Sequence, residues 1–183
     1  MRWDGLFAEL EAEFEAADAL HADAELRDRV RRETATVRLV DRLAAARGGE
    51  VAVYVAGALL RGRLSDSGPD WLLLVEIPGR DALIPLAAVA SVAGLGRWSA
   101  VAGSEGRVGA RLDLAYVLRG LARDRAGVTL ALIDGSTCSG TIDRVGADFI
   151  EIAEHPVAEA RREQAVLAVR TVPRSALLVV RSG

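Results

Sequence analysis

The feature that most constrains the fold is an internal repeat, because the middle and the C-terminal part of the chain are two copies of one unit. At an offset of 78 residues, Leu43 falls on Leu121 and the match runs on to Ile152. The second copy then carries ten extra residues, and the match resumes at an offset of 88 with Pro85 on Pro173. A match sustained at one offset predicts that both copies share a fold.

Three pairs of glycines lie at the first offset. They are Gly57 with Gly135, Gly62 with Gly140, and Gly68 with Gly146. Glycine alone adopts positive φ angles, or lets another backbone approach closely, at little cost. We therefore expect these six glycines to meet structural requirements of the backbone in both copies.

The sequence of each copy predicts a helix followed by five short strands. Apolar periodicity predicts helices at 34–47 and 112–125. Alternating apolar residues between turn residues predict strands at 51–55, 59–64, 70–75, 82–85 and 89–92, and again at 128–133, 137–145, 148–153, 166–172 and 175–181. Five short strands with tight turns are typical of a small barrel.

The predicted domain organisation has four parts: an N-terminal helical arm at 1–33, a first unit at 34–93, a linker at 94–107 and a second unit at 108–183. Residues 4–25 hold eight acids and no base, whereas 26–47 hold seven arginines and three acids. Apolar residues recur at steps of three and four along the arm, at Trp3, Leu6, Phe7, Leu10, Phe14, Ala17 and Leu20. Two interpretations remain open: a docking or coiled-coil arm for a partner, or a helix that packs on its own barrel.

The second copy resembles the Sm-like fold of Sm, LSm and bacterial Hfq proteins. Residues 132–152 carry the resemblance, with a turn at Gly135, a second glycine at Gly140 in a bent strand, and an apolar strand after Gly146. The resemblance implies a mainly β protein with helices, built from two tandem five-stranded Sm-like barrels that each follow an α-helix. It also implies RNA binding, and homo-oligomers formed through the edges of the fourth and fifth strands. The chain further resembles actinobacterial proteins that open Met-Arg-Trp-Asp-x-Leu-Phe, which implies no activity.

The candidate nucleic-acid-binding residues are arginines on barrel loops and strands: Arg144, Arg170, Arg174, Arg61 and Arg63. All 23 cationic residues are arginine. Two explanations are open: arginine serves to recognise phosphate groups, or the codon usage of a GC-rich genome favours it. A net charge of −3 argues against a general nucleic-acid coat. These arginines are therefore interpreted either as a local rim for phosphates or as solvated charges that keep a sheet edge soluble.

Two positions depart from the Sm-like pattern. The turns at 67–70 and 145–148 have neither the asparagine nor the stacking aromatic of the family. Where Hfq has Tyr-Lys-His, this chain has Pro173-Arg174-Ser175, so that only Arg174 keeps a positive charge. We expect Trp71 and Phe149, which begin the third strand of each copy, to be core residues.

No arrangement of residues indicates catalysis, so we expect a non-enzyme without cofactor or metal. His21 and His155 are isolated in polar stretches, and the spacing of two histidines and one cysteine fits no metal site. We expect Cys138 to be a small buried apolar residue, and Asp143 and Asp148 to cap turns locally.

The sequence favours a non-catalytic, RNA-associated protein, with a protein-interaction or oligomerisation scaffold as the alternative. No apolar run reaches the roughly 18 residues that a membrane helix needs, and the N-terminus does not resemble a secretory signal. The single cysteine has no partner for an internal disulfide, so a cytoplasmic location is expected.

Overall fold

The computed structural model describes residues 21, 23–76, 79–100, 112–155 and 168–182. The chain divides into two compact units, Met1–Val37 and Arg38–Gly183. In the first unit residues 23–36 are helical, and all of their side chains are exposed. Within the described ranges, no helix has the length and apolar character needed to cross a membrane.

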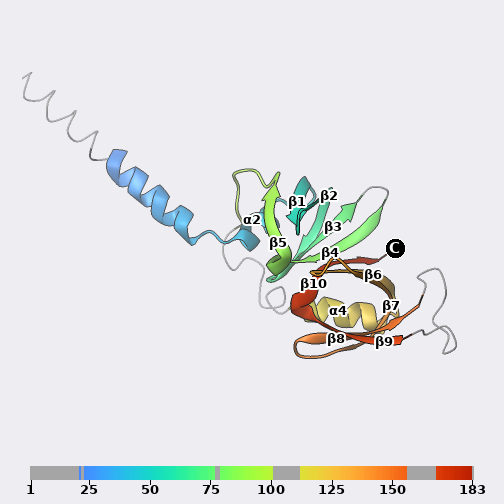
Figure 1. Cartoon of the computed structure of the whole chain (residues 1–183). Coiled ribbons are helices and arrows are strands. Elements are labelled where there is room, and N and C mark those ends of the chain that lie inside the picture. Colours follow the sequence, from blue (N-terminus) through green and yellow to red (C-terminus); the bar gives the residue numbers. More distant parts are fainter. Residues whose placement is uncertain (1–20, 22, 77–78, 101–111, 156–167, 183) are drawn as a thin grey trace, which may run out of the picture. The chain divides into compact units, whose positions relative to one another are not determined.

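The second unit contains both copies of the repeat (Figure 1). The first copy has α2 (Leu39–Ala45), β1 (Glu50–Val55), β2 (Ala58–Ser67), β3 (Trp71–Glu76), β4 (Arg80–Pro85), the short 3-10 helix η1 (Leu86–Ala88) and β5 (Val89–Ala93). The second copy has α4 (Leu114–Arg123), β6 (Gly127–Leu132), β7 (Thr137–Val145), β8 (Phe149–Glu154), β9 (Ala168–Pro173), η3 (Arg174–Ala176) and β10 (Leu177–Ser182). The expected class, mainly β with helices, is confirmed.

All ten strands belong to one antiparallel sheet in the order β5-β1-β2-β3-β4-β10-β6-β7-β8-β9. The order of the first copy is therefore repeated in the second. The copies join where β4 pairs with β10, with Leu83 opposite Val180 (Figure 1). Strands of the predicted units 34–93 and 108–183 belong to this one sheet. No described strand pairs with the outer edge of β5 or of β9, so the sheet is not closed.

The two offsets seen in the sequence hold for most strands. The third strands begin 78 residues apart, at Trp71 and Phe149, and the fourth strands end 88 residues apart, at Pro85 and Pro173. The first strand departs by one residue, because Gly62 lies opposite Val51 whereas Gly140 lies opposite Val128. The single offset of 78 predicted for this strand is therefore wrong by one.

The extra residue lies in the hairpin turn of the second copy. Gly135 has a φ of 82° in this turn, and Gly57 has a φ of 80° in the shorter turn of the first copy. Asp134 fixes the longer turn, since its Oδ1 accepts hydrogen bonds from the backbone nitrogen (2.9 Å) and the hydroxyl (2.7 Å) of Ser136. These bonds stabilise the carboxylate and lower the pKa of Asp134 below its ordinary value.

Gly62 and Gly140 lie at the same position of the second strand in each copy, where the third strand comes close. A Cβ atom at Gly62 would overlap the carbonyl group of Val75, whose carbon would lie 2.9 Å away. At Gly140 it would overlap the carbonyl of Ala153 in the same way, with the carbon at 2.8 Å. Both contacts are with backbone, which cannot move aside, so the repeated glycine is required by the close approach of the neighbouring strand.

The cores of the two copies interlock. Val179 of β10 is buried in the cluster of the first copy, together with Val53, Leu64 and Ile84. In the opposite direction, first-copy residues Trp71 and Leu83 are buried in the cluster of the second copy. The copies are therefore held by side-chain packing as well as by strand pairing.

Candidate functional site

The junction between the copies is built around the start of α4. Trp71 is 5% exposed, and its Nε1 donates a hydrogen bond to the carbonyl oxygen of Leu112 (2.6 Å). The neighbouring Asp70 accepts a hydrogen bond through Oδ1 from the backbone nitrogen of Leu114 (2.8 Å), one of the free amides at the helix start. Trp71 thus belongs to the core, as the sequence predicts, and also ties the first copy to the helix of the second.

An ion pair at the other end of β3 also joins the two copies. The Nε of Arg181 on β10 lies 2.9 Å from Oε2 of Glu76 on β3, and a second nitrogen lies 3.4 Å from Oε1. Both side chains are largely shielded, at 26% and 17% exposed. A two-pronged arginine–carboxylate contact fixes orientation as well as charge, so it specifies how the copies meet.

The outer edges of the sheet lack several of the side chains that make this junction. Repeat equivalence places Thr171 of β9 where β4 has Leu83, and Ser91 of β5 where β10 has Val179. Phe149, which carries no hydrogen-bond donor, stands in the place of Trp71. Thr171 and Ser91 are exposed. At these two positions the edges expected to pair with neighbouring chains offer polar residues where the internal junction buries apolar ones. Elsewhere they stay apolar, since Val92 of β5 is equivalent to Val180 and Val169 of β9 is 61% exposed.

Two of the candidate arginines of the second copy already have carboxylate partners. Arg144 Nε lies 3.3 Å from Oε2 of Glu151, which is on the neighbouring strand. Arg170 Nε lies 2.5 Å from Oε1 of Glu154, and this contact raises the pKa of the Arg170 guanidinium. A phosphate that approached either arginine would also approach an acidic group, which would repel it.

Arg174 is held by the turn between β7 and β8. Its backbone nitrogen donates to the carbonyl oxygen of Asp148 (2.7 Å), and its Nη2 donates to the carbonyl oxygen of Ala147. Its Nε is buried and has no hydrogen-bond partner among the described residues. The guanidinium of Arg174 therefore stabilises this turn, and only part of it is available to a ligand.

The first copy does not reproduce this group of arginines. The positions of Arg144, Arg170 and Arg174 are occupied there by Asp66, Ala82 and Leu86. Asp66 forms an ion pair with Arg47 at 3.0 Å. The three-arginine rim considered from the sequence thus belongs to one copy alone, and its arginines are engaged by their own chain.

Arg61 and Arg63 have a different environment on β2. Both are exposed, and neither has an ion pair or a side-chain hydrogen bond with another described residue. Arg61 lies opposite Ala52 and Arg63 lies opposite Glu50, and farther along the same hairpin face Tyr54 lies opposite Leu59. Tyr54 and Leu59 are 43% and 39% exposed, so this face combines two arginines with an exposed aromatic and an exposed aliphatic side chain.

His155 was expected in a polar stretch, and the structure shows it buried. It is 4% exposed, its Nε2 lies 2.7 Å from Oγ1 of the buried Thr141, and its backbone nitrogen donates to Ser139. The repeat could have predicted this burial, because His155 aligns with the apolar residue Ile77 of the first copy. Asp143, expected to act locally, forms an ion pair with Arg125 at 3.0 Å.

Cys138 is buried on β7, as predicted. Burial removes the thiolate from water and raises the pKa of Cys138. We therefore expect the native protein to react at least about tenfold more slowly than the denatured chain with a thiol reagent at mildly alkaline pH, since the thiolate is the reactive form. The absorbance released by a chromogenic disulfide reagent measures both rates, and equal rates would show that Cys138 is accessible.

In the described part of the chain, no three histidine, cysteine or acidic side chains gather in a way that would hold a metal ion. Comparison with protein-family models, with curated proteins and with solved structures found no match to this chain.

Proposed function

We propose that this protein is a non-catalytic, cytoplasmic assembly scaffold made of two fused Sm-like barrels. Support for the Sm-like assignment comes from the repeated order of a helix and five antiparallel strands, with a glycine in the second strand where the third strand approaches closely. The observation that carries the scaffold function is the junction, where β4–β10 pairing and exchanged core residues make one body of two copies.

The two open edges of the sheet carry exposed polar side chains. Thr171 and Ser91 are exposed at the outer strands, and the ion pair of Arg170 with Glu154 adds charge beside β9. Natural sheets protect edge strands with charged and polar groups that discourage further pairing. Partners are therefore expected to bind away from these edges, on exposed faces and on the N-terminal arm.

RNA association through the hairpin of the first copy is a second candidate. It is favoured by the exposed Arg61, which lies opposite Ala52, and by the nearby Tyr54; Arg63 is exposed too and forms no ion pair with a described residue, but it lies opposite Glu50. Single-stranded RNA is bound by arginines that contact phosphates and by aromatic rings that stack on bases. The rim of Arg144, Arg170 and Arg174 has weaker support, because its guanidinium groups are engaged.

Binding of a short dye-labelled single-stranded RNA, followed by fluorescence anisotropy at low salt, separates the two functions. A scaffold is expected to give no saturable binding. Saturable binding that Arg61→Ala with Arg63→Ala weakens would establish the second candidate, and the slope of log affinity against log salt is then expected to fall by about 1.4.

Arg144→Ala with Arg174→Ala is the matched variant at the rim. If RNA binds through the first-copy hairpin, this double variant is expected to bind as the wild type does. Loss of binding in this variant alone would contradict both proposals and assign RNA recognition to the rim.

A further inference from the structure

The two helices of the repeat end in the same way, which fixes how their residues correspond. At the end of α2 the backbone nitrogen of Ala46 donates to the carbonyl oxygen of Arg42 (3.2 Å). At the end of α4 the backbone nitrogen of Asp124 donates to the carbonyl oxygen of Gly120 (2.9 Å). The offset of 78 residues therefore holds for the helices, and Gly120 stands in the place of Arg42.

The chain that follows β5 lies across α2. Leu95 is buried in the core cluster of the first copy. Arg42 donates through Nη2 to the carbonyl oxygen of Gly96 (2.5 Å), and the backbone nitrogen of Ala100 donates to the carbonyl oxygen of Asp41 (2.9 Å). Asp41 is only 2% exposed. This face of the helix can therefore be covered by a short, non-helical segment of chain.

No described segment makes the equivalent contacts on α4. Its outward face carries four residues within about 100° around the helix axis: Tyr116, Arg119, Gly120 and Arg123. Tyr116 is 54% exposed. Arg119 is exposed as well, whereas its equivalent Asp41 is buried. Among the described residues, the second helix thus presents openly the face that the first helix has covered.

The centre of this face is positively charged. Within its bounds α4 holds two arginines and no acid. The acids at its ends are engaged, since Asp70 and Asp113 cap the helix start and Asp124 pairs with Arg123 at 3.3 Å. Arg119 forms no ion pair or side-chain hydrogen bond with another described residue. A segment that covers Arg119 must therefore bring a carboxylate, because a charge removed from water needs a partner.

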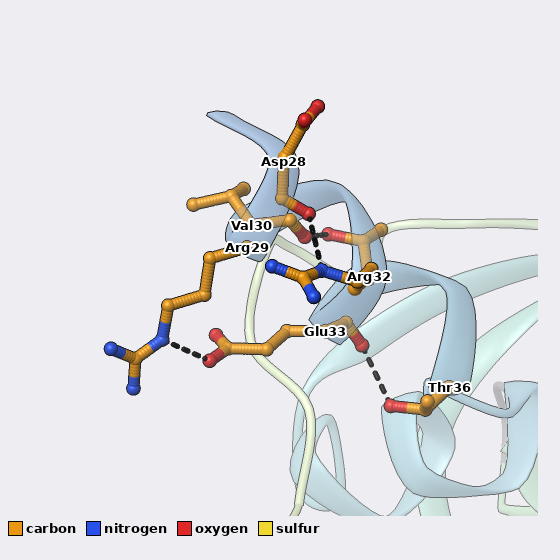
Figure 2. A network of polar contacts seen from close by, with 7 residues as sticks. Asp28, Arg29, Val30, Arg32, Glu33 and Thr36 are labelled. Atoms are coloured by element: carbon orange, nitrogen blue, oxygen red, sulfur yellow. Dashed lines mark hydrogen bonds and ion pairs between the residues drawn. The ribbon is translucent and has the colours of Figure 1, made fainter. Parts of the chain in front are cut away.

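Exposed arginines on the helix of the first unit are placed differently. Arg29 donates through Nε to Oε1 of Glu33 (3.0 Å), and Arg32 donates through Nε to the carbonyl oxygen of Asp28 (3.3 Å) (Figure 2). Each of these guanidinium groups has an acceptor on its own helix. Arg119 has none among the described residues, so it is the more open anchor for an acidic ligand.

The fold, as far as it is described, does not require a glycine at position 120. Gly120 does not have a positive φ, and a Cβ atom there would lie in open space. Glycine nevertheless destabilises a helix relative to alanine. At the centre of an exposed face it lets another backbone approach closely, which suits a segment that crosses the helix.

We propose that this face of α4 binds a short acidic segment of a partner protein, much as residues 94–100 lie on α2. A carboxylate of the segment pairs with the guanidinium of Arg119, and its backbone passes over Gly120. An apolar side chain of the segment packs on the ring of Tyr116. The inference rests on the proposed scaffold function and names the chemistry of one partner.

Selection of short random peptides displayed on phage against the full-length protein tests the proposal. The enriched peptides should carry Asp or Glu close to an apolar residue. Arg119→Glu should weaken their binding by about tenfold or more, because an attractive contact becomes repulsive. Gly120→Gln should weaken it too, because the side chain fills the space over the helix. Fluorescence anisotropy of the labelled peptides measures both effects.

Arg97→Glu is the matched control, because it makes the same charge change at an exposed arginine beside α2 and should leave peptide binding unchanged. Circular dichroism confirms that the variants stay folded. A library without enrichment over a blank surface, or peptides that bind Arg119→Glu as tightly as the wild type, would overturn the proposal.

A second copy of the chain is the other occupant that the experiment distinguishes. Light scattering reads the mass of the wild type against the 19.4 kDa chain. A dimer that Arg119→Glu dissociates would assign the face to a second copy and overturn the proposal, whereas it predicts that this substitution leaves the mass unchanged. RNA binding is measured separately, so the proposed function and this inference can fail independently.

Discussion

Trp71→Ala is expected to destabilise the protein by about 3–5 kcal/mol, the usual cost of removing a large buried aromatic side chain. Trp71 packs in the core of the second copy although it belongs to the first, so its loss leaves a cavity at the junction. The substitution also leaves the Leu112 carbonyl without its indole donor. Chemical denaturation followed by circular dichroism measures the change in the free energy of unfolding.

Trp71→Phe separates the two contributions. Phenylalanine keeps most of the packing and is the residue found at the equivalent position 149, but it cannot donate to Leu112. We expect a cost of about 1–3 kcal/mol from the unsatisfied carbonyl and the smaller ring. Because the cores interlock, both variants should unfold in one transition, and separate transitions for the two copies would contradict the junction as described.

Gly140→Ala is expected to destabilise the protein by about 3 kcal/mol, near the upper end for overpacking a rigid site. The added Cβ would overlap the Ala153 carbonyl on β8, and relief requires that two hydrogen-bonded strands separate. Thermal denaturation of the variant should show a clearly lower midpoint. Gly62→Ala should act in the same direction, because the Val75 carbonyl occupies the equivalent position.

Gly120→Ala is the matched control and should have the opposite sign. Gly120 lies within α4, does not have a positive φ, and would place its Cβ in open space. Alanine at such a helix position is expected to stabilise by about 0.5–1 kcal/mol. Equal effects at Gly120 and Gly140 would show that close strand approach is not the reason for the repeated glycine.

The sequence predicts the helices and strands better than it predicts which strands pair with each other. The fixed offset and the alternation of apolar residues identify the strands and the glycines at Gly62 and Gly140, because both are local requirements of a backbone. The β4–β10 junction is different, since an edge strand can pair with its own chain or with another one. The sequence does not decide between these two, and the structure shows pairing within the chain.

The candidate arginines illustrate the same limit. Their positions on loops and strands can be read from the sequence, but the partners of Arg144 and Arg170 depend on which residues face each other across β7, β8 and β9. A shift of one residue in register would turn the carboxylates to the other face of the sheet. The burial of His155 was missed because the residues around it are polar, although the repeat aligns it with an isoleucine.

Sedimentation velocity of the full-length protein with a dye-labelled single-stranded RNA at low salt tests the scaffold function most directly. The protein is followed by its own absorbance and the RNA by its dye. The account predicts that the RNA sediments as it does alone, while the protein forms a separate and faster boundary. RNA that moves with the protein boundary, and is released by added salt, would contradict the scaffold function and identify a nucleic-acid-binding protein.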